Sequence, residues 1–196
     1  MGKTTVKISF LFFAMLTVIF AMDEKMISIV AIFSVALHEL GHIAAMMVLK
    51  KHPAEIYFGI FGVRIKHNTY KLSYGQELFV VICGPLVNAI LFVTFFVVYL
   101  AFEEYLFLVI SAVNLSVGAF NLLPVFALDG GRILQSVLSR FMSAEKTCSV
   151  MRLVSVSVSL AVVLAGTLLA VKTGANFSLL ATGVYLSVMC IKAIKI

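Results

Sequence analysis

Six long apolar segments, separated by short polar connections, constrain this chain more than any other feature of its sequence. Each is close to the roughly 20 residues that a helix needs to cross the hydrocarbon core of a bilayer. The segments run over residues 6–22, 26–49, 77–101, 105–123, 153–171 and 176–191. With 62% hydrophobic and only 12% charged residues, the chain of 196 residues has too few polar side chains to cover a water-soluble domain. The sequence therefore predicts an all-α polytopic membrane protein with about six transmembrane helices, and it excludes a soluble globular domain, a disordered chain and a disulfide scaffold.

The basic residues are concentrated on alternate connections between these segments. Thirteen of the fifteen fall on one side of the predicted bundle: Lys3, Lys7, Lys50, Lys51, Arg64, Lys66, Lys71, Arg132, Arg140, Lys146, Arg152, Lys192 and Lys195. Basic connections stay in the cytoplasm, so both termini are expected to be cytoplasmic, and an even number of crossings agrees with this. The net charge of +6 thus reflects the topology of a multi-pass protein, and no nucleic-acid partner is expected.

Residues 55–74 differ from the rest of the chain in their pattern. Residues 63–66 alternate between apolar and basic side chains, Asn68 favours a turn, and residues 70–74 resume the alternation. This period of two predicts a short β-hairpin on the cytoplasmic side. Its apolar start, residues 56–61, indicates that the hairpin is associated with the membrane and is covered by protein or paired there.

The strongest chemical signal is an HExxH motif in the middle of the second apolar segment, formed by His38, Glu39 and His42. On a helix, residues four apart lie about 40° apart, so both imidazoles project from one face and form half of a zinc site. Glu39 points elsewhere and can reach a water molecule beside the metal. The other residues on the histidine face are small: Ser34, Gly41 and Ala45. The alternative is a pair of core histidines with a glutamate that reaches for the interface, but each ionisable group near the midplane costs about 2.5–3.5 kcal/mol on insertion scales.

A catalytic zinc needs a third protein ligand. Ala45 and Val48 stand where a metzincin would have Gly and His, so that soluble pattern is excluded. His52 and His67 lie in the basic connection, outside the predicted span, and are weaker candidates. Asp129 is the better candidate because, apart from Glu39, it is the only carboxylate flanked on both sides by apolar sequence.

The surroundings of Asp129 leave two interpretations open. Pro124 and the pair Gly130 and Gly131 break the helix, so the carboxylate can be directed inward from irregular backbone. Alternatively, Asp129 caps a helix over residues 130–142, and the two roles do not exclude each other.

Two asparagines also stand in apolar sequence. Asn88 follows Gly84 and Pro85, and we interpret this segment as a site of helix packing with a proline kink. Asn121 either donates a hydrogen bond to a substrate carbonyl or caps the broken helix before Pro124.

Together these pieces resemble the site-2 protease family of intramembrane zinc metalloproteases. The matching elements are HELGH at 38–42, GPLVN at 84–88 and NLLPVFALDGGR at 121–132. The resemblance covers about residues 25–140. The sequence at 121–132 is most similar to that of the subgroup that processes sporulation sigma factors. Members of that subgroup usually carry a CBS domain, and other members of the family carry a PDZ domain. Here we expect a single membrane-embedded peptidase domain over 1–196 with neither.

The resemblance implies a role for each matching residue. His38, His42 and Asp129 would bind Zn²⁺, and Glu39 would be the catalytic base. Two residues of the 121–132 stretch would shape the substrate groove: Asn121 and Pro124. The hairpin expected over 55–74 would correspond to the polypeptide hairpin that the family carries near its second and third spans.

The expected function is therefore that of an intramembrane zinc metalloprotease in a bacterial or archaeal cell membrane. It would cut a membrane-spanning or membrane-associated protein near the cytoplasmic face, in the lipid bilayer, with a membrane protein as a possible regulator. Two alternatives stay open. One is a catalytically inactive scaffold of the same fold, and the other is a transporter that uses the intramembrane His, Glu and Asp as an ion or proton relay.

Overall fold

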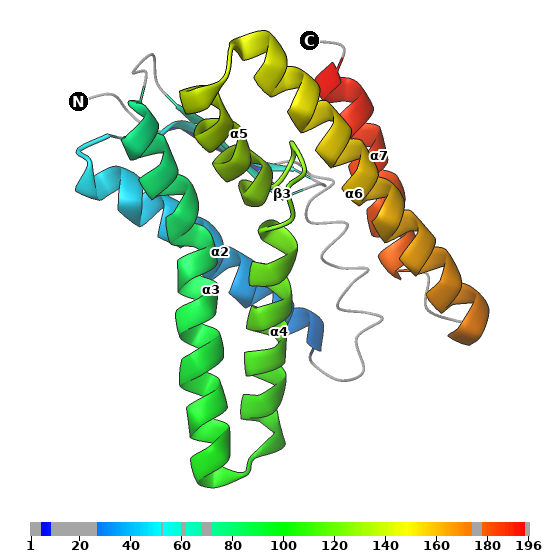
Figure 1. Cartoon of the computed structure of the whole chain (residues 1–196). Coiled ribbons are helices and arrows are strands. Elements are labelled where there is room, and N and C mark those ends of the chain that lie inside the picture. The colour runs from blue at the N-terminus through cyan, green and yellow to red at the C-terminus, as the bar shows by residue number, and fades with distance from the viewer. Residues whose placement is uncertain are drawn as a thin grey trace. The chain divides into compact units, whose positions relative to one another are not determined.

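The computed structural model describes residues 5–8, 27–51, 53–59, 62–67, 72–173 and 178–194. The chain divides into two compact units, Met1–Ala119 and Phe120–Ile196, and each unit is described by itself. The elements are labelled in Figure 1 and run in the order β1 (Thr5–Ile8), α2 (Ile27–Val48), β2 (Pro53–Gly59), β3 (Gly62–His67), α3 (Tyr74–Phe102), α4 (Tyr105–Asn121), α5 (Asp129–Phe141), α6 (Ala144–Thr173) and α7 (Ser178–Ile194).

The first unit contains a three-stranded sheet in the order β1-β2-β3. β1 pairs with β2 in parallel, and β2 pairs with β3 antiparallel, with Gly59 opposite Gly62. The antiparallel pair overlaps the stretch 55–74 in which the alternation predicts a hairpin. The pairing of β2 with β3 ends at Gly59 and Gly62, while Asn68, where the sequence favours a turn, lies outside the described residues.

The predicted return strand over residues 70–74 is wrong at its end, because α3 begins at Tyr74. The reason is a capping box. The Ser73 hydroxyl accepts a hydrogen bond from the Gln76 backbone N–H, and the Gln76 side chain accepts one from the Ser73 N–H. These bonds satisfy donors that the first turn of a helix otherwise leaves unpaired, and they start the helix before the apolar run begins.

Helices α3 and α4 pack side by side as an antiparallel pair (Figure 1). Phe95 stacks on Phe107 with ring centroids 6.1 Å apart, and the Ser111 hydroxyl donates to the Phe92 carbonyl at 3.1 Å. α3 ends at Glu103, whose backbone is left-handed (φ 56°) and whose N–H donates to the Tyr99 carbonyl.

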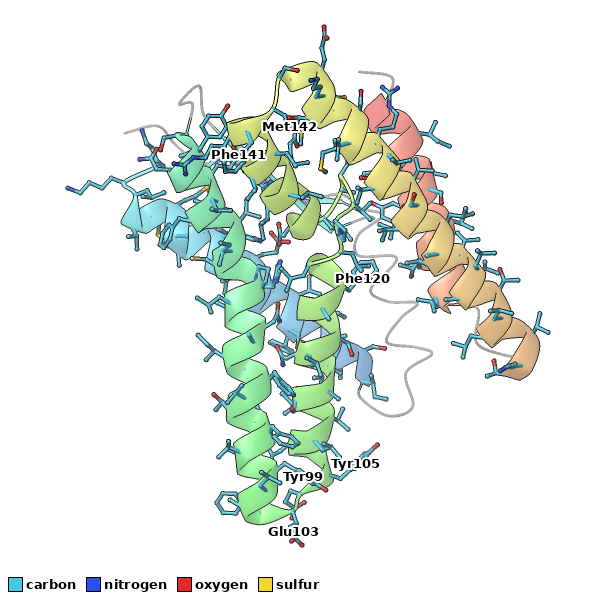
Figure 2. All side chains as sticks on the ribbon, viewed as in Figure 1. Tyr99, Glu103, Tyr105, Phe120, Phe141 and Met142 are labelled. Carbon is cyan, nitrogen blue, oxygen red and sulfur yellow. The ribbon has the colours of Figure 1, made fainter. Side chains whose placement is uncertain are left out.

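Figure 2 shows Tyr99, Glu103 and Tyr105 gathered at this turn between α3 and α4. Tyr105 is largely exposed. Tyrosines beside a charged turn are typical of the level at which a membrane helix meets water, because the ring is apolar and the hydroxyl is polar.

In the second unit, an irregular segment precedes α5, and α6 and α7 pack along each other (Figure 1). Its core contains Val125, Leu186 and Cys190, all buried. Phe126 of the irregular segment is tied to α6, since its N–H donates to the Ser155 hydroxyl at 3.1 Å. The helix expected over 130–142 is present as α5, but the prediction that Asp129 caps it is wrong, because Leu128 is the N-cap residue and Asp129 is the first residue of the helix.

The helices have apolar outer faces and small or polar inner ones. Large apolar side chains are more than half exposed on α3 and α6, among them Ile90, Val93, Val97, Leu100, Leu160, Leu164 and Leu168. The buried positions include Asn88, Ser111, Asn114, Ser155 and Ser159. This distribution suits a lipid solvent, in which helices associate through small and hydrogen-bonding residues.

Among the described residues, three helices are long and apolar enough to cross a membrane: α2, α3 and α6. The shorter α4 and residues Leu179–Ile191 of α7 are also apolar. These five helices overlap the last five predicted segments. α6 starts nine residues before its predicted segment, because its first turns carry Glu145, Lys146 and Arg152 and give no apolar signal.

The first predicted segment, 6–22, is only partly described. Its first residues, Val6 to Ile8, belong to strand β1 and not to a helix, because they pair with Ile56 to Phe58 of β2. The β-branched Val6 and Ile8 favour this extended backbone. The remainder of the segment lies outside the described residues.

The close contact of α6 with α7 can be tested at Gly166. A Cβ atom there would lie 2.5 Å from the Leu180 backbone nitrogen and 2.6 Å from its Cα. Gly166→Ala should therefore push the helices apart and cost about 1–3 kcal/mol, as overpacking does. We expect a lower melting temperature in detergent, by several degrees for a chain of this size.

Gly75→Ala is the matched control, because nothing lies within 4 Å of a Cβ at Gly75 in the first turn of α3. Alanine there should leave the melting temperature unchanged or raise it. Equal melting temperatures for the two variants would contradict the packing of α6 on α7.

Candidate metal centre

The HExxH motif lies in the middle of α2, and its histidine face is turned inward. His38 is 2% exposed and His42 5%. Ser34, Gly41 and Ala45, the small residues expected on the same face, are buried as well. A Cβ at Gly41 would lie 2.7 Å from the Cys83 carbonyl oxygen, so glycine is what allows α2 to approach α3 this closely.

Each imidazole is held through its Nδ1 atom by α3. His42 Nδ1 lies 2.8 Å from the Val80 carbonyl oxygen. A carbonyl oxygen can only accept, so Nδ1 of His42 carries the proton and donates it. His38 Nδ1 lies 2.6 Å from the Asn88 side-chain oxygen, which likewise only accepts. Both neutral rings therefore present an unprotonated Nε2.

The two Nε2 atoms converge at a separation of 3.2 Å. With both protons on Nδ1, two lone pairs face the same point, and neither ring has a proton to offer the other. Such a pair fits a cation. An ion at the usual Zn–N distance of about 2.0–2.1 Å from each nitrogen would subtend an angle of about 100°, close to the tetrahedral value of a zinc site.

Gly84 of α3 lies directly against this point. A Cβ atom at Gly84 would collide with Cε1 and Nε2 of His42 and would lie 2.8 Å from Nε2 of His38. Glycine therefore leaves room for both imidazoles against α3. The sequence predicts only helix packing for this segment and does not show its contact with the histidines.

A signal for this role was present in the spacing. Val80, Gly84 and Asn88 follow one another at intervals of four residues, as His38 and His42 do, so each set forms one stripe on its helix. On α3, Val80 supplies an acceptor to His42, Gly84 leaves room for the imidazoles, and Asn88 supplies an acceptor to His38. A single sequence does not reveal which stripes face each other.

Glu39 follows His38 on α2 and is half-buried. Glu39 is next to the imidazole pair but lies off the histidine face. This is the position that the sequence predicts for a residue that acts on a water molecule and is not a metal ligand. His67 belongs to β3, where only the backbone is described, and His52 lies outside the described residues.

The other predicted site residues belong to the second unit. Asp129 is buried and stands at the positive N-terminal end of α5, which favours its negative charge. Its carboxylate lies 3.7 Å from the Arg132 guanidinium. Asn121 is the last residue of α4, and the Pro124 carbonyl accepts from the Ser155 hydroxyl at 3.5 Å. The roles of Asn121 and Pro124 at a substrate stay predictions.

Two glycines set the conformation around Asp129. A Cβ at Gly130 would collide with the Leu122 carbonyl, and one at Gly131 with the Val125 carbonyl. The backbone before α5 therefore folds directly onto the first turn of the helix. This close approach explains the Gly-Gly pair better than a flexible turn does.

The apolar helices define an integral membrane protein, and the imidazole pair places a metallopeptidase motif on a buried helix face. Known proteins are similar to this chain in sequence and in structure. The profile of peptidase family M50 matches residues 101–166. The solved structure of the site-2 protease from Methanocaldococcus jannaschii is similar with a TM-score of 0.71 and 27% sequence identity, over 100% of this chain and 93% of that one. Zinc metalloprotease MJ0392 of the same organism is 35% identical over 144 residues.

The chain is therefore similar to a site-2 protease over its whole length and to peptidase family M50 over residues 101–166. The match to zinc metalloprotease MJ0392 covers 69% of this chain but 41% of that protein, so the chain spans about two fifths of its length. The subgroup that processes sporulation sigma factors stays a prediction, since neither relative is described as one.

Gly84→Ala tests the close approach of the two imidazoles to α3. The added methyl group would overlap the His42 ring and displace it from His38, so we expect zinc binding to weaken by more than the roughly 10–100-fold that follows loss of an outer-shell partner. Zinc affinity is measured by competition with a chelator in detergent.

Gly75→Ala serves as the control, because nothing lies within 4 Å of a Cβ there. Its zinc affinity should stay within a few-fold of the original. If Gly84→Ala bound zinc as tightly as Gly75→Ala, the metal position inferred beside the two imidazoles would be wrong.

Proposed function

We propose that the protein is an intramembrane zinc metalloprotease that hydrolyses a peptide bond of a membrane-spanning or membrane-associated protein. The observation that carries the proposal is the convergence of two unprotonated Nε2 atoms, 3.2 Å apart, within an HExxH motif on a buried helix face. In a purely structural pair, one imidazole would more naturally donate an Nε2–H to the Nε2 atom of the other. Two lone pairs directed at one point need a cation.

Asp129 is proposed as the third ligand, beside His38 and His42. A catalytic zinc is held by three protein ligands and keeps one position open. Asp129 is a carboxylate in apolar surroundings, it is buried, and it is the residue that the family resemblance assigns to this role. The start of α5 fixes its backbone, and Arg132 beside it favours the ionised form that a ligand requires.

When bound, the zinc would act as a Lewis acid on the substrate carbonyl and would make a water molecule a stronger nucleophile. Glu39 takes the proton of this water as its oxygen attacks the peptide carbon. The same carboxyl then gives the proton to the nitrogen of the leaving amine, so that the peptide bond breaks and Glu39 is ionised again. Asn121 donates a hydrogen bond to a substrate carbonyl, and Pro124 shapes the groove without competing as a donor.

The substrate must be extended at the cut, because a helical segment hides its carbonyl in its own hydrogen bonds. The sheet offers a means of holding it, since an unwound segment can add as a further strand at a sheet edge. The pattern of basic residues places the sheet and both termini on the cytoplasmic side. We therefore propose six spans, a single peptidase domain over 1–196, and cleavage near the cytoplasmic face.

The metal content of the purified protein tests the core of this proposal. Plasma mass spectrometry should find about one zinc per chain in detergent, and His38→Ala should lose it because one of the converging nitrogens is gone. A folded protein without zinc would contradict the proposal and favour a scaffold or an ion relay.

Glu39→Gln separates the chemistry from metal binding. The variant should keep its zinc but lose cleavage of a model membrane substrate by at least the 10²–10⁴-fold that a general base contributes. Glu77→Gln is the control, since Glu77 is also a half-buried glutamate, in the first turn of α3. Substantial cleavage by Glu39→Gln would exclude Glu39 as the base.

Asp129→Asn tests the third ligand. The amide is a much poorer zinc ligand, so the affinity for zinc should fall by more than about 100-fold, beyond the effect of an outer-shell residue. Arg132→Ala removes the neighbouring charge but no ligand, and an exposed or half-exposed ion pair is worth little, so its affinity should change only a few-fold. Unchanged zinc binding in Asp129→Asn would mean that the third ligand lies elsewhere.

A further inference from the structure

A chain of two buried asparagines leads from α4 through α3 to His38. Asn88 is completely buried and Asn114 is 2% exposed. Asn114 Nδ2 donates to the Ile110 carbonyl at 2.9 Å, and Asn88 Nδ2 donates to Asn114 Oδ1 at 3.0 Å. Asn88 Oδ1 then faces His38 Nδ1 at 2.6 Å.

Backbone carbonyls determine which way each amide points. The Ile110 carbonyl can only accept, so Asn114 must turn its NH₂ group toward it and its oxygen toward Asn88. Asn88 Nδ2 faces two acceptors, Asn114 Oδ1 and the Ser34 carbonyl at 3.3 Å. If Asn88 were flipped, its oxygen would oppose both of these oxygens, and two hydrogen bonds would be lost.

The orientation of Asn88 in turn decides where His38 carries its proton. Only an oxygen is available opposite Nδ1, so the proton must lie on Nδ1, and Nε2 is left with the lone pair that a metal needs. In the other tautomer, Nε2–H would point into the metal position, and Nδ1 would face the Asn88 oxygen without a proton between them.

We infer that Asn88 is a positioning residue that fixes the tautomer and ring orientation of His38 for zinc, and that Asn114 acts through Asn88 by fixing its amide. The inference rests on the proposed function insofar as the metal is zinc. It assigns Asn88 a role that helix packing alone does not require, because packing would be served equally by either amide orientation.

The Nδ1 atom of His42 is held differently, by the Val80 backbone carbonyl at 2.8 Å. A backbone acceptor cannot flip or be changed by substitution. The tautomer of His38 is therefore the one that side chains control, and substitutions at Asn88 and Asn114 should alter it without changing His42.

The test compares zinc affinity, by chelator competition, in Asn88→Leu, Asn88→Asp, Asn114→Leu and the double variant Asn88→Leu/Asn114→Leu. Asn88→Leu keeps the size but removes the acceptor, and we expect affinity to fall by about 10–100-fold. Asn88→Asp keeps an acceptor for Nδ1–H and should bind more tightly than Asn88→Leu, even though it loses both donated bonds.

Asn114→Leu should weaken zinc binding less than Asn88→Leu, because the Ser34 carbonyl still orients Asn88. The double variant should bind no more weakly than Asn88→Leu alone, since Asn114 acts only through Asn88. If the losses of zinc affinity were additive in the double variant, the inference that Asn114 acts through Asn88 would be wrong.

Ser111→Ala is the matched control. Ser111 is as deeply buried and also bonds α4 to α3, through the Phe92 carbonyl, but it is not connected to His38. It should lower thermal stability and leave zinc affinity unchanged. A merely structural role of Asn88 predicts the opposite pattern, with zinc affinity following thermal stability in every variant.

Nitrogen NMR of the metal-free protein provides a readout that does not depend on zinc. At about pH 8, where a free imidazole is neutral, His38 should be protonated at Nδ1 in the original chain and in Ser111→Ala. In Asn88→Leu, or in Asn114→Leu if the former does not fold, the other tautomer should become populated.

The outcomes separate this inference from the proposed function. A folded original chain that binds no zinc contradicts the proposed function, while the NMR result still decides the tautomer. A chain that binds zinc, with Asn88→Leu binding it equally well and His38 unchanged in tautomer, overturns the positioning role and leaves the proposed function intact.

Discussion

The close approach of α2 to α3 is the contact on which the metal centre depends. In lipid, the hydrophobic effect does not drive two apolar helices together, so their association must come from close packing and hydrogen bonds. Gly41 provides this closeness on α2, against the Cys83 carbonyl, and Gly84 provides it on α3, against the imidazoles. Only at this distance can His42 reach the Val80 carbonyl and His38 reach Asn88. The glycines bring the helices together and thereby allow the hydrogen bonds that set the tautomers of His38 and His42.

The polar groups inside the first unit stabilise the bundle and the site at once. Asn88 joins three helices, because it bonds the Ser34 carbonyl of α2, Asn114 of α4 and His38. In a low-dielectric interior an unpaired amide is costly, so such a network forms in one arrangement or not at all. Because of that requirement, Asn88 does more than pack helices together: it determines which nitrogen of His38 carries the proton.

Much of this arrangement could be predicted from the sequence. The apolar segments located five of the described helices, and the spacing of His38, Glu39 and His42 identified the histidine face. The sequence alone could not show that Val80, Gly84 and Asn88 face that stripe, since periodicity fixes a face and not its partner. It also missed the polar start of α6 and the strand β1, whose identity depends on pairing with β2. The pair of strands ends at Gly59 and Gly62, which the alternation did not single out, and the turn predicted at Asn68 lies outside the described residues.

The irregular backbone before α5 follows from the same constraint of an apolar environment. Non-helical backbone in a membrane protein must find its hydrogen bonds within the protein. Here the Leu128 N–H donates to the Val125 carbonyl, and Ser155 of α6 bonds both the Phe126 N–H and the Pro124 carbonyl. Because Gly130 and Gly131 have no side chains, this backbone can pack directly against the first turn of α5. Asp129 thus lies at the start of a helix, and the packed backbone before this helix fixes its position. The role proposed for Asp129 as a ligand needs such fixation, because a residue on a loose turn would lose too much conformational freedom on binding an ion.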